Sequence, residues 1–93
     1  MSITRINEFR AQEGSGDLLH QLIKSTVPVI EASAGCQSCQ VLRSQKDRNH
    51  IIVLEVWESI DAHQASLKTI SPDVFHEVKK LLAAPPTGEY YND

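Results

Sequence analysis

An unbroken apolar run in the middle of the chain restricts the fold more than any other feature. Residues 50 to 58 read as a β-strand, and Ile51-Ile52-Val53-Leu54 within it is apolar at four consecutive positions. Successive side chains of a strand point to opposite faces of the sheet, so both faces of this strand are apolar. Helices of the same chain can cover only one of them. The other face predicts packing against the sheet of a second copy, and hence a homodimer.

The N-terminal part of the chain predicts a strand followed by a long helix. Residues 2 to 10 alternate loosely between apolar and polar side chains, which is typical of a strand. From Asp17 apolar residues recur at helical spacing until Gly35 stops the pattern. Pro28 predicts a kink near residues 25 to 27. The segment is therefore either one kinked helix or two shorter helices. The apolar positions of this helix are Leu18, Leu19, Leu22, Ile23, Val29, Ile30 and Ala34.

Two strand-like runs in the middle of the chain predict a β-hairpin. Residues 36 to 44 and 50 to 58 are separated by a polar five-residue connector. Pairing Ser44 with His50 sets the register of the two strands. One face then carries the pairs Val41 with Val53, Cys39 with Glu55 and Gln37 with Trp57, and the other carries Leu42, Ile52, Leu54 and Val56.

The C-terminal part predicts two short helices and a last strand. Ser59 is typical of a helix cap, and the spacing of the following apolar residues places His63 on their stripe, so that it points inward. A Ser-Pro pair at 71–72 predicts the start of a further helix. Residues 87 to 93 predict a short strand with one tyrosine on each face, both read as edge-strand residues. The first stripe is Ile60, His63, Leu67 and Ile70, and the second helix is expected to bury Val74, Phe75, Val78, Leu81 and Leu82.

These elements follow in the order β α β β α α β within a single domain of residues 1–93. The length leaves room for one hydrophobic core. The order predicts an α+β, ferredoxin-like antiparallel sheet with the helices on one face. Together with the two-faced central strand, it predicts two such sheets packed against each other.

Charge and composition exclude several classes of partner. The chain carries 9 Lys and Arg against 12 Asp and Glu, and its basic residues are scattered rather than gathered on one helix face. This distribution lacks the electrostatic footprint of nucleic-acid binding and of recruitment to an anionic membrane. No apolar run approaches the roughly 20 residues of a spanning helix, and the N-terminus resembles no secretion signal. We therefore expect a cytoplasmic protein whose two cysteines are thiols.

Cys36 and Cys39 form a CxxC spacing that predicts neither a redox motif nor a metal site. A redox pair places its first thiolate at a helix N-terminus, whereas this pair opens a strand. Residues an odd number apart on a strand point to opposite faces, so the two thiols are not expected to bridge. A zinc site lacks its second ligand pair, because His50 lies at the other end of the hairpin. With no phosphate-binding glycine loop, nucleophile elbow or HExxH motif, we predict no metal and no cofactor.

His63 and Trp57 are the residues around which a chemical site can be built. An imidazole on an apolar helix face stays neutral and can exchange a proton near neutral pH. A buried histidine that is hydrogen-bonded to a backbone carbonyl is the alternative interpretation. Trp57 leads into the helix of His63 and either lines the same pocket or packs in the core or the dimer interface. Glu55 shares the face of Trp57 and requires a partner if buried, for which Arg5 or Arg43 is available.

The run from Val53 to Ser66, together with Gly35-Cys36 after a long first helix, resembles the antibiotic biosynthesis monooxygenase domain family. Its most specific part is the E-x-W-x-S-x-[ED]-A pattern that joins the strand to the next helix, and the resemblance spans nearly the whole chain. It implies a dimeric α+β barrel of two ferredoxin-like sheets. It also implies oxidation of phenols or hydroquinones to quinones by molecular oxygen, without metal, flavin or haem. A deprotonated aromatic substrate can itself pass an electron to oxygen in a dry pocket.

The same resemblance implies roles for three residues. His63 would assist deprotonation, Trp57 would shape an aromatic pocket, and Asn7 would donate a hydrogen bond to a developing oxyanion. Many members carry a histidine nine positions after the tryptophan, where this chain has Ser66. His63 lies one helical turn earlier on the same face and either takes over that role or leaves it unfilled.

A haem-degrading branch of the family fits the sequence less well. Its asparagine, tryptophan and histidine fall at Phe9, Ser66 and Lys79, although His76 lies on the same helix as Lys79. The expected function is therefore a cofactor-independent monooxygenase that acts on a small aromatic. The alternative is a non-catalytic dimeric module that binds a small hydrophobic ligand or a protein partner through the same cavity.

Overall fold

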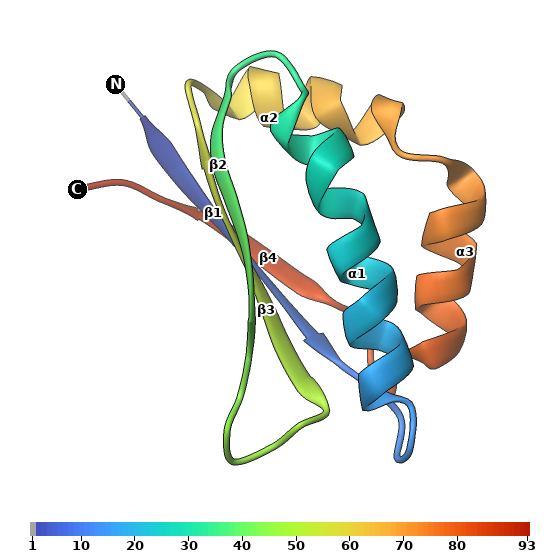
Figure 1. Cartoon of the computed structure of the whole chain (residues 1–93). Helices are drawn as coiled ribbons and strands as arrows, with labels where there is room; N and C mark the ends of the chain where they lie inside the picture. The colour runs from blue at the N-terminus through green and yellow to red at the C-terminus, as the bar shows by residue number, and fades with distance from the viewer. Residues whose placement is uncertain (1) are drawn as a thin grey trace.

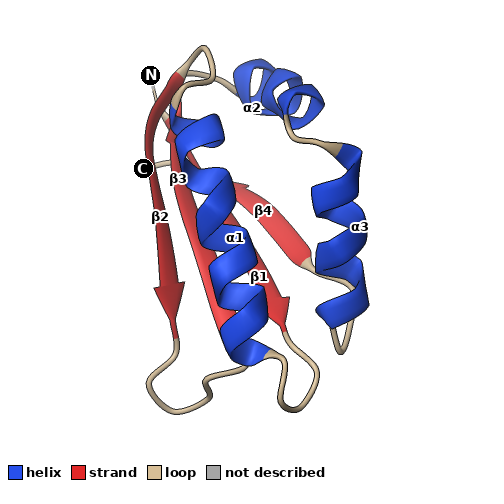
Figure 2. Ribbon diagram, turned by 45° about the vertical axis from the view of Figure 1, so that its right-hand side comes forward, coloured by secondary structure: helices blue, strands red, loops and turns tan. Residues whose placement is uncertain are grey.

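A four-stranded antiparallel sheet with its helices on one face makes up the fold (Figure 1, Figure 2). The computed structural model describes residues 2–93, and the strands lie in the order β2-β3-β1-β4. The predicted α+β, ferredoxin-like order βαββααβ is confirmed, with a short 3-10 turn, η1, before the third helix. The elements are β1 (Ile3–Arg10), α1 (Gly16–Glu31), β2 (Cys36–Arg43), β3 (His50–Trp57), α2 (Ile60–Ser66), η1 (Leu67–Thr69), α3 (Pro72–Leu81) and β4 (Thr87–Tyr91).

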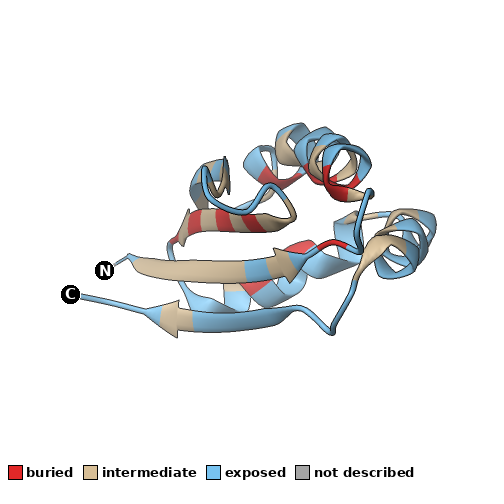
Figure 3. Ribbon diagram, turned by 90° about the horizontal axis from the view of Figure 1, so that it is seen from below, coloured by how far each residue is buried: buried red, intermediate tan, exposed pale blue. Residues whose placement is uncertain are grey.

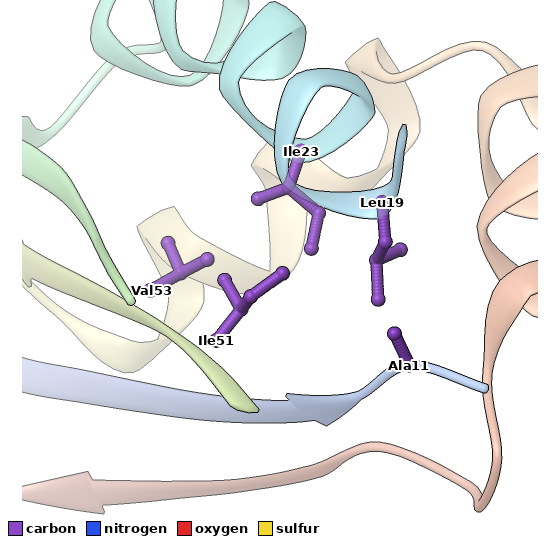
Figure 4. Close-up of a cluster of buried hydrophobic side chains, with 5 residues drawn as sticks. All are labelled: Ala11, Leu19, Ile23, Ile51 and Val53. Atoms are coloured by element: carbon purple, nitrogen blue, oxygen red, sulfur yellow. The ribbon is translucent and has the colours of Figure 1, made fainter. Parts of the chain in front are cut away.

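The helix-facing side of β3 forms the centre of the core. Its buried positions alternate with half-buried ones along the strand, as Figure 3 shows, and they are Ile51, Val53, Glu55 and Trp57. Leu19 and Ile23 of α1 extend toward this side of the sheet, where they form one cluster with Ala11 (Figure 4). Apolar burial of this kind is the main favourable term in folding, so α1 is held on the sheet chiefly by these contacts.

The opposite side of β3 is apolar as well, and no helix of residues 2–93 lies over it (Figure 2). Ile52, Leu54 and Val56 occupy this side and remain half-buried. Leu42 of β2 pairs with Ile52 and is exposed. The predicted strand with two apolar faces is therefore confirmed, and one chain leaves one of the faces open.

A β-bulge changes the predicted register at one end of the hairpin. Val41 pairs with Val53 and Cys39 pairs with Glu55, both as predicted. The predicted pairing of Gln37 with Trp57 is wrong, because an irregularity between Cys36 and Ser38 inserts one residue and places Cys36 opposite Trp57. Cys36 and Cys39 therefore pair with Trp57 and Glu55, which lie on the same face of β3. The expectation that the two cysteines point to opposite faces is corrected accordingly. Both cysteines are free.

The first helix is shorter and narrower in its contacts than predicted. It runs as one α-helix through Pro28 and ends at Glu31, before Ala34. Leu18 and Val29, which were predicted on the packing face, are 58% and 43% exposed. The physical reason is that α1 packs on the sheet along one side only, so only a narrow stripe of its surface, which includes Leu19 and Ile23, is covered.

The second half of the molecule departs further from the predicted burial. Ile60 is exposed at the first position of α2, while Ser66 at its last position is buried. Leu67 is exposed because the chain tightens into η1 after Ser66, which rotates the side chains that follow. No residue of α3 is fully buried, and Phe75 is exposed. α3 packs beside α1 rather than on the sheet (Figure 1), so its apolar side chains face a partly open space.

Candidate active site

Strand pairing brings three polar residues into one row across the sheet. Arg5 of β1 pairs with Glu55 of β3 on one side and with Tyr90 of β4 on the other. Asn7 lies two residues further along β1, opposite Gly88, and so faces the same side. This is the side that carries the helices.

Glu55 is a buried carboxyl group held by two side-chain donors. It is 4% exposed, and it accepts hydrogen bonds from Trp57 Nε1 at 2.8 Å and from Asn7 Nδ2 at 3.0 Å. Burial raises the pKa of Glu55, while the hydrogen bond from Trp57, the charge of Arg5 and the hydrogen bond from Asn7 act in the opposite direction. The two donors therefore favour the ionised form of a carboxyl group that burial would otherwise keep protonated.

The predicted partners of Glu55 are only partly right. Arg5 acts on it at one remove, since its Nε donates to Asn7 Oδ1 at 2.9 Å and Asn7 in turn donates to Glu55. Arg43 is not a partner: its guanidinium lies 2.7 Å from Asp17 at the start of α1. Arg43 lies at the far end of β2, beyond reach of the row that contains Glu55.

His63 is carried into the interior by the first turns of α2. The helix begins after Ser59, whose hydroxyl accepts from the backbone N–H of Ala62 at 3.1 Å. His63 is 4% exposed, and its Nδ1 is hydrogen-bonded to the Tyr90 hydroxyl at 2.6 Å. Its ring also packs edge-on against the rings of Trp57 and Tyr90, with centroids 5.5 and 5.4 Å away. The partner of this histidine is therefore a side-chain hydroxyl and not a backbone carbonyl.

The electrostatic environment of His63 favours the neutral imidazole. Burial and, to a smaller extent, the charge of Arg5 lower the pKa of His63 from its ordinary value of 6.5. Its second nitrogen, Nε2, lies 3.8 Å from Glu55 Oε1, which is too long for a hydrogen bond. Nε2 makes no hydrogen bond within residues 2–93, and His63 lines a cavity between the sheet and the helices. Nε2 is the atom through which His63 can meet a ligand.

A cavity of about 280 Å³ lies between the sheet and the helices. Its polar end is formed by Arg5, Asn7, Glu55 and His63, and aliphatic and aromatic side chains form most of the remaining wall. This volume is at the small end of the range for ligand pockets, which suits a molecule of one or two rings. Trp57 is not part of the wall. It lies behind Glu55 and His63 and holds both in place. The apolar wall includes Phe9, Ile23, Ile30, Val53, Leu67, Ile70, Val74, Phe75, Val78 and Leu82.

A second hollow of about 370 Å³ adjoins this cavity on the outer side of η1 and α3. The two share Leu67, Ile70, Phe75 and Lys79 in their walls. Leu67 and Phe75 are 45% and 41% exposed. These side chains therefore stand between the cavity and the surface, and movement of a few rotamers would connect the two.

Two members of this site escaped the sequence analysis. Tyr90 was interpreted as an edge-strand residue, and Arg5 was considered only as a neutralising partner. The alternation of the last strand does place one of its two tyrosines on the helix face. Nothing in the local sequence indicates that this strand pairs with β1, and that pairing puts Tyr90 next to Arg5 and His63.

Other classes of site have little support in the described part of the chain. Among residues 2–93, no group of three or more His, Cys, Asp and Glu side chains is arranged to hold a metal ion. None of the helices formed by these residues is long and apolar enough to cross a membrane. Burial raises the pKa of the Cys39 thiol to about 12, so this cysteine is a poor nucleophile at neutral pH.

Replacing Gly88 with alanine is expected to disturb the polar end of the cavity. A Cβ at this position would collide with the Arg5 guanidinium and would lie 2.6 Å from Asn7 Oδ1. We expect the Arg5 and Asn7 side chains to move aside at a cost of up to about 1 kcal/mol in the free energy of unfolding, with a shifted NMR resonance for the Trp57 indole N–H, which belongs to the same network. Thr87→Ala, at the exposed neighbouring position, is the control. An unchanged indole resonance in Gly88→Ala would contradict the proposed crowding.

The sequence matches one family model, described as antibiotic biosynthesis monooxygenase, over residues 2–80. No curated protein sequence matches the chain at a significant level. The match includes β1, the hairpin and α2, and therefore every residue of the polar cluster except Tyr90.

Solved structures with the same fold are numerous. A candidate antibiotic biosynthesis monooxygenase from Chloroflexus aurantiacus is 28% identical with a TM-score of 0.76, covering 100% of this chain and 95% of that one. An alanine mutant of SnoaB, a cofactor-independent oxygenase from Streptomyces nogalater, is 17% identical with a TM-score of 0.82, covering 99% and 92%. The Rv0793 protein of Mycobacterium tuberculosis is 19% identical with a TM-score of 0.85, covering 100% and 95%. The last two likenesses concern the fold alone.

Proposed function

Because this chain belongs to the antibiotic biosynthesis monooxygenase family, we propose that it oxidises a small phenol or hydroquinone with molecular oxygen and without a cofactor. The observation that carries the proposal is a buried, neutral His63 at the polar end of an apolar cavity. A base in a dry pocket can deprotonate an electron-rich aromatic, and the resulting anion can pass an electron to oxygen without further help. The protein then has to bind, orient and deprotonate its substrate.

The atoms and electrons of this reaction balance without another reductant. A phenol with a free para position takes up one oxygen atom, gives a quinone and releases the second oxygen atom as water. The phenol supplies all four electrons that the reduction of O₂ requires. A hydroquinone instead gives up two electrons and two protons, and the products are a quinone and hydrogen peroxide.

The polar cluster supplies the groups that the first step requires. We assign to His63 Nε2 the removal of the phenolic proton, while the Tyr90 hydroxyl fixes the ring through Nδ1. The Glu55 carboxylate, 3.8 Å from Nε2, stabilises the imidazolium that forms. Asn7 lines the same cavity, and the second N–H of its amide is available for a substrate oxyanion. Trp57 acts as a positioning residue through Glu55.

Oxygen consumption by metal-free protein tests the proposal. The protein would be treated with a chelator and supplied with a panel of phenols, hydroquinones and naphthols in an oxygen electrode. Incorporation of one atom of ¹⁸O₂ into the quinone would identify a monooxygenase, whereas peroxide without incorporation would identify an oxidase. Binding of these aromatics without oxygen uptake would contradict the proposal and support a non-catalytic binding module.

The acidic limb of the pH dependence of kcat is expected below pH 6.5. The pKa of His63 is lowered from 6.5, and a base works in its neutral form, so activity is present above the lowered pKa and is lost as the pH falls through it. Arg5→Gln removes a positive charge that lowers this pKa and should move the limb to higher pH. Initial rates between about pH 5 and 8, with a substrate that does not titrate there, provide the measurement. A limb above 6.5 in the wild-type protein would contradict the assignment of the base.

The open face of the sheet is proposed to pair with the same face of a second copy. Ile6, Leu42, Leu54 and Val56 make this face apolar, and one chain leaves it uncovered. Apolar faces of this kind are rarely left exposed on soluble monomers. Two sheets packed face to face would form the dimeric barrel that the family resemblance implies.

Gel filtration with light scattering is expected to give twice the 10.4 kDa of one chain. Leu54→Asp places a charge in the middle of the open face and should shift the protein toward monomer. Leu18→Asp is the control, because Leu18 is 58% exposed on the helix side and lies away from the proposed interface. A monomeric wild-type protein would rule out the barrel.

A further inference from the structure

The guanidinium of Arg5 indicates that the cavity binds a ligand with a negatively charged group, which its apolar wall alone would not select. Arg5 is half-buried and lines the cavity, and its Nε donates to Asn7 Oδ1 at 2.9 Å. Its Cζ lies over the Tyr90 ring, 4.5 Å from the ring centroid, which is a cation–π contact. Among residues 2–93, no carboxylate lies within ion-pair distance of it, so the N–H groups of its two terminal nitrogens have no acidic partner.

Strand register aims this group at the cavity. Arg5 lies between Glu55 and Tyr90 in one row of the sheet. Gly88 is on β4, two residues before Tyr90. The missing side chain at Gly88 leaves the space that the guanidinium occupies, because a Cβ there would collide with it. The planar cation is therefore held by neighbours on β1 and β4.

The charge of the cavity wall differs from that of the whole chain. The chain carries a net charge of -3, whereas the wall contains Arg5 and Lys79 against a single acidic residue, Glu55. Both oxygens of Glu55 already accept hydrogen bonds, from Trp57 and from Asn7. The net charge of the wall is therefore positive, with Arg5 near the base and Lys79 at the border with the outer hollow.

We propose that the ligand is a hydroxylated aromatic carboxylate, whose carboxylate is bound by the Arg5 fork while its phenolic hydroxyl meets His63. Arginine matches a carboxylate with two parallel N–H donors, and such charge-assisted pairs are strong where water is excluded. Lys79, at the wall shared with the outer hollow, adds attraction at the entrance. The inference rests on the proposed function and names its substrate class.

Matched ligands that differ only in charge test the inference. 2,5-Dihydroxybenzoate and 2,5-dihydroxybenzamide have the same ring and hydroxyl groups, and isothermal titration calorimetry under anaerobic conditions measures their binding without turnover. We expect the carboxylate to bind at least about tenfold more tightly than the amide to the wild-type protein. Arg5→Gln should abolish this preference while affinity for the amide stays within about threefold, and Arg5→Lys should restore only part of it.

Arg10→Gln is the control variant, because Arg10 is on the same strand but its side chain is exposed and lies near Asp47. It should keep the full preference for the carboxylate. If the amide bound as tightly as the carboxylate to the wild-type protein, or if neither bound, the inference would be overturned even without a folded Arg5 variant. An unchanged preference in Arg5→Gln would also overturn it and would leave Arg5 only the role of balancing Glu55.

The result separates this inference from the proposed function. Binding of the carboxylate through Arg5 without oxygen uptake would contradict catalysis and leave the ligand class standing. Oxygen uptake with neutral phenols, together with no preference for the carboxylate, would support catalysis and contradict the ligand class.

Discussion

Replacing Trp57 with alanine is expected to lower the free energy of unfolding by about 3–5 kcal/mol, the largest stability effect in the chain. Trp57 is the largest of the fully buried side chains, at 0% exposure. Its removal leaves a cavity on the helix-facing side of the sheet and deprives Glu55 Oε1 of the donor that lies 2.8 Å away. Chemical unfolding at one fixed protein concentration measures the effect, since unfolding of a dimer depends on concentration.

Two matched variants separate packing from hydrogen bonding at this position. Trp57→Phe keeps an aromatic ring but removes the donor, and should cost about 1–3 kcal/mol at pH 7. The hydrogen bond favours the ionised form of Glu55, whose pKa burial raises above 4.5, so its contribution is present above that raised pKa and is lost as the pH falls through it. Leu18→Ala, at a 58% exposed position, should change stability by less than about 0.5 kcal/mol. A Trp57→Ala loss as small as that of Leu18→Ala would contradict the packing role.

Replacing His63 with alanine is expected to reduce kcat by about 10²–10⁴-fold, the range typical of a lost general base. Imidazole is the side chain whose ordinary pKa lies nearest neutral pH, and Nε2 of His63 has no hydrogen-bond partner within the described residues. Initial rates of oxygen uptake with the best substrate of the panel measure the effect. Added imidazole should restore part of the activity, because it can occupy the space left by the side chain.

Tyr90→Phe and His20→Ala complete this comparison. Tyr90→Phe removes the hydroxyl that holds Nδ1 at 2.6 Å, and should lower kcat less than His63→Ala while leaving the base in place. His20 lies on α1 outside the wall of the cavity, so its replacement should leave turnover unchanged. Full turnover by His63→Ala would remove the proposed base and, with it, the assigned mechanism.

Most of the fold could be predicted from local patterns. The apolar run in β3 predicted a strand with two apolar faces, and the polar connector after Ser44 set the register that pairs Val41 with Val53. The cap at Ser59 marked the start of α2 correctly. Such signals survive because a strand or a helix repeats its side-chain directions over a few residues, whatever surrounds it.

The errors lie where one element meets another. The bulge between Cys36 and Ser38 shifted one end of the register, and no residue type in the sequence marks it. Apolar residues of α3 were expected to be buried, but Phe75 is exposed because α3 packs beside α1 and over a cavity. Periodicity gives the direction of a side chain and says nothing about how closely another layer approaches it.

By itself, the sequence determined the order of the elements, the two apolar faces of β3 and the inward direction of His63, because these depend on spacing along the chain. Only the tertiary structure decided which polar groups meet. Arg5, Glu55 and Tyr90 form one row because β1 lies between β3 and β4 in the sheet. The paired residues Arg5 and Glu55 are more than 45 residues apart in the sequence. The cavity exists because α3 stands off the sheet. Long-range pairing and the distance between layers are properties of the whole packing, and no local pattern encodes them.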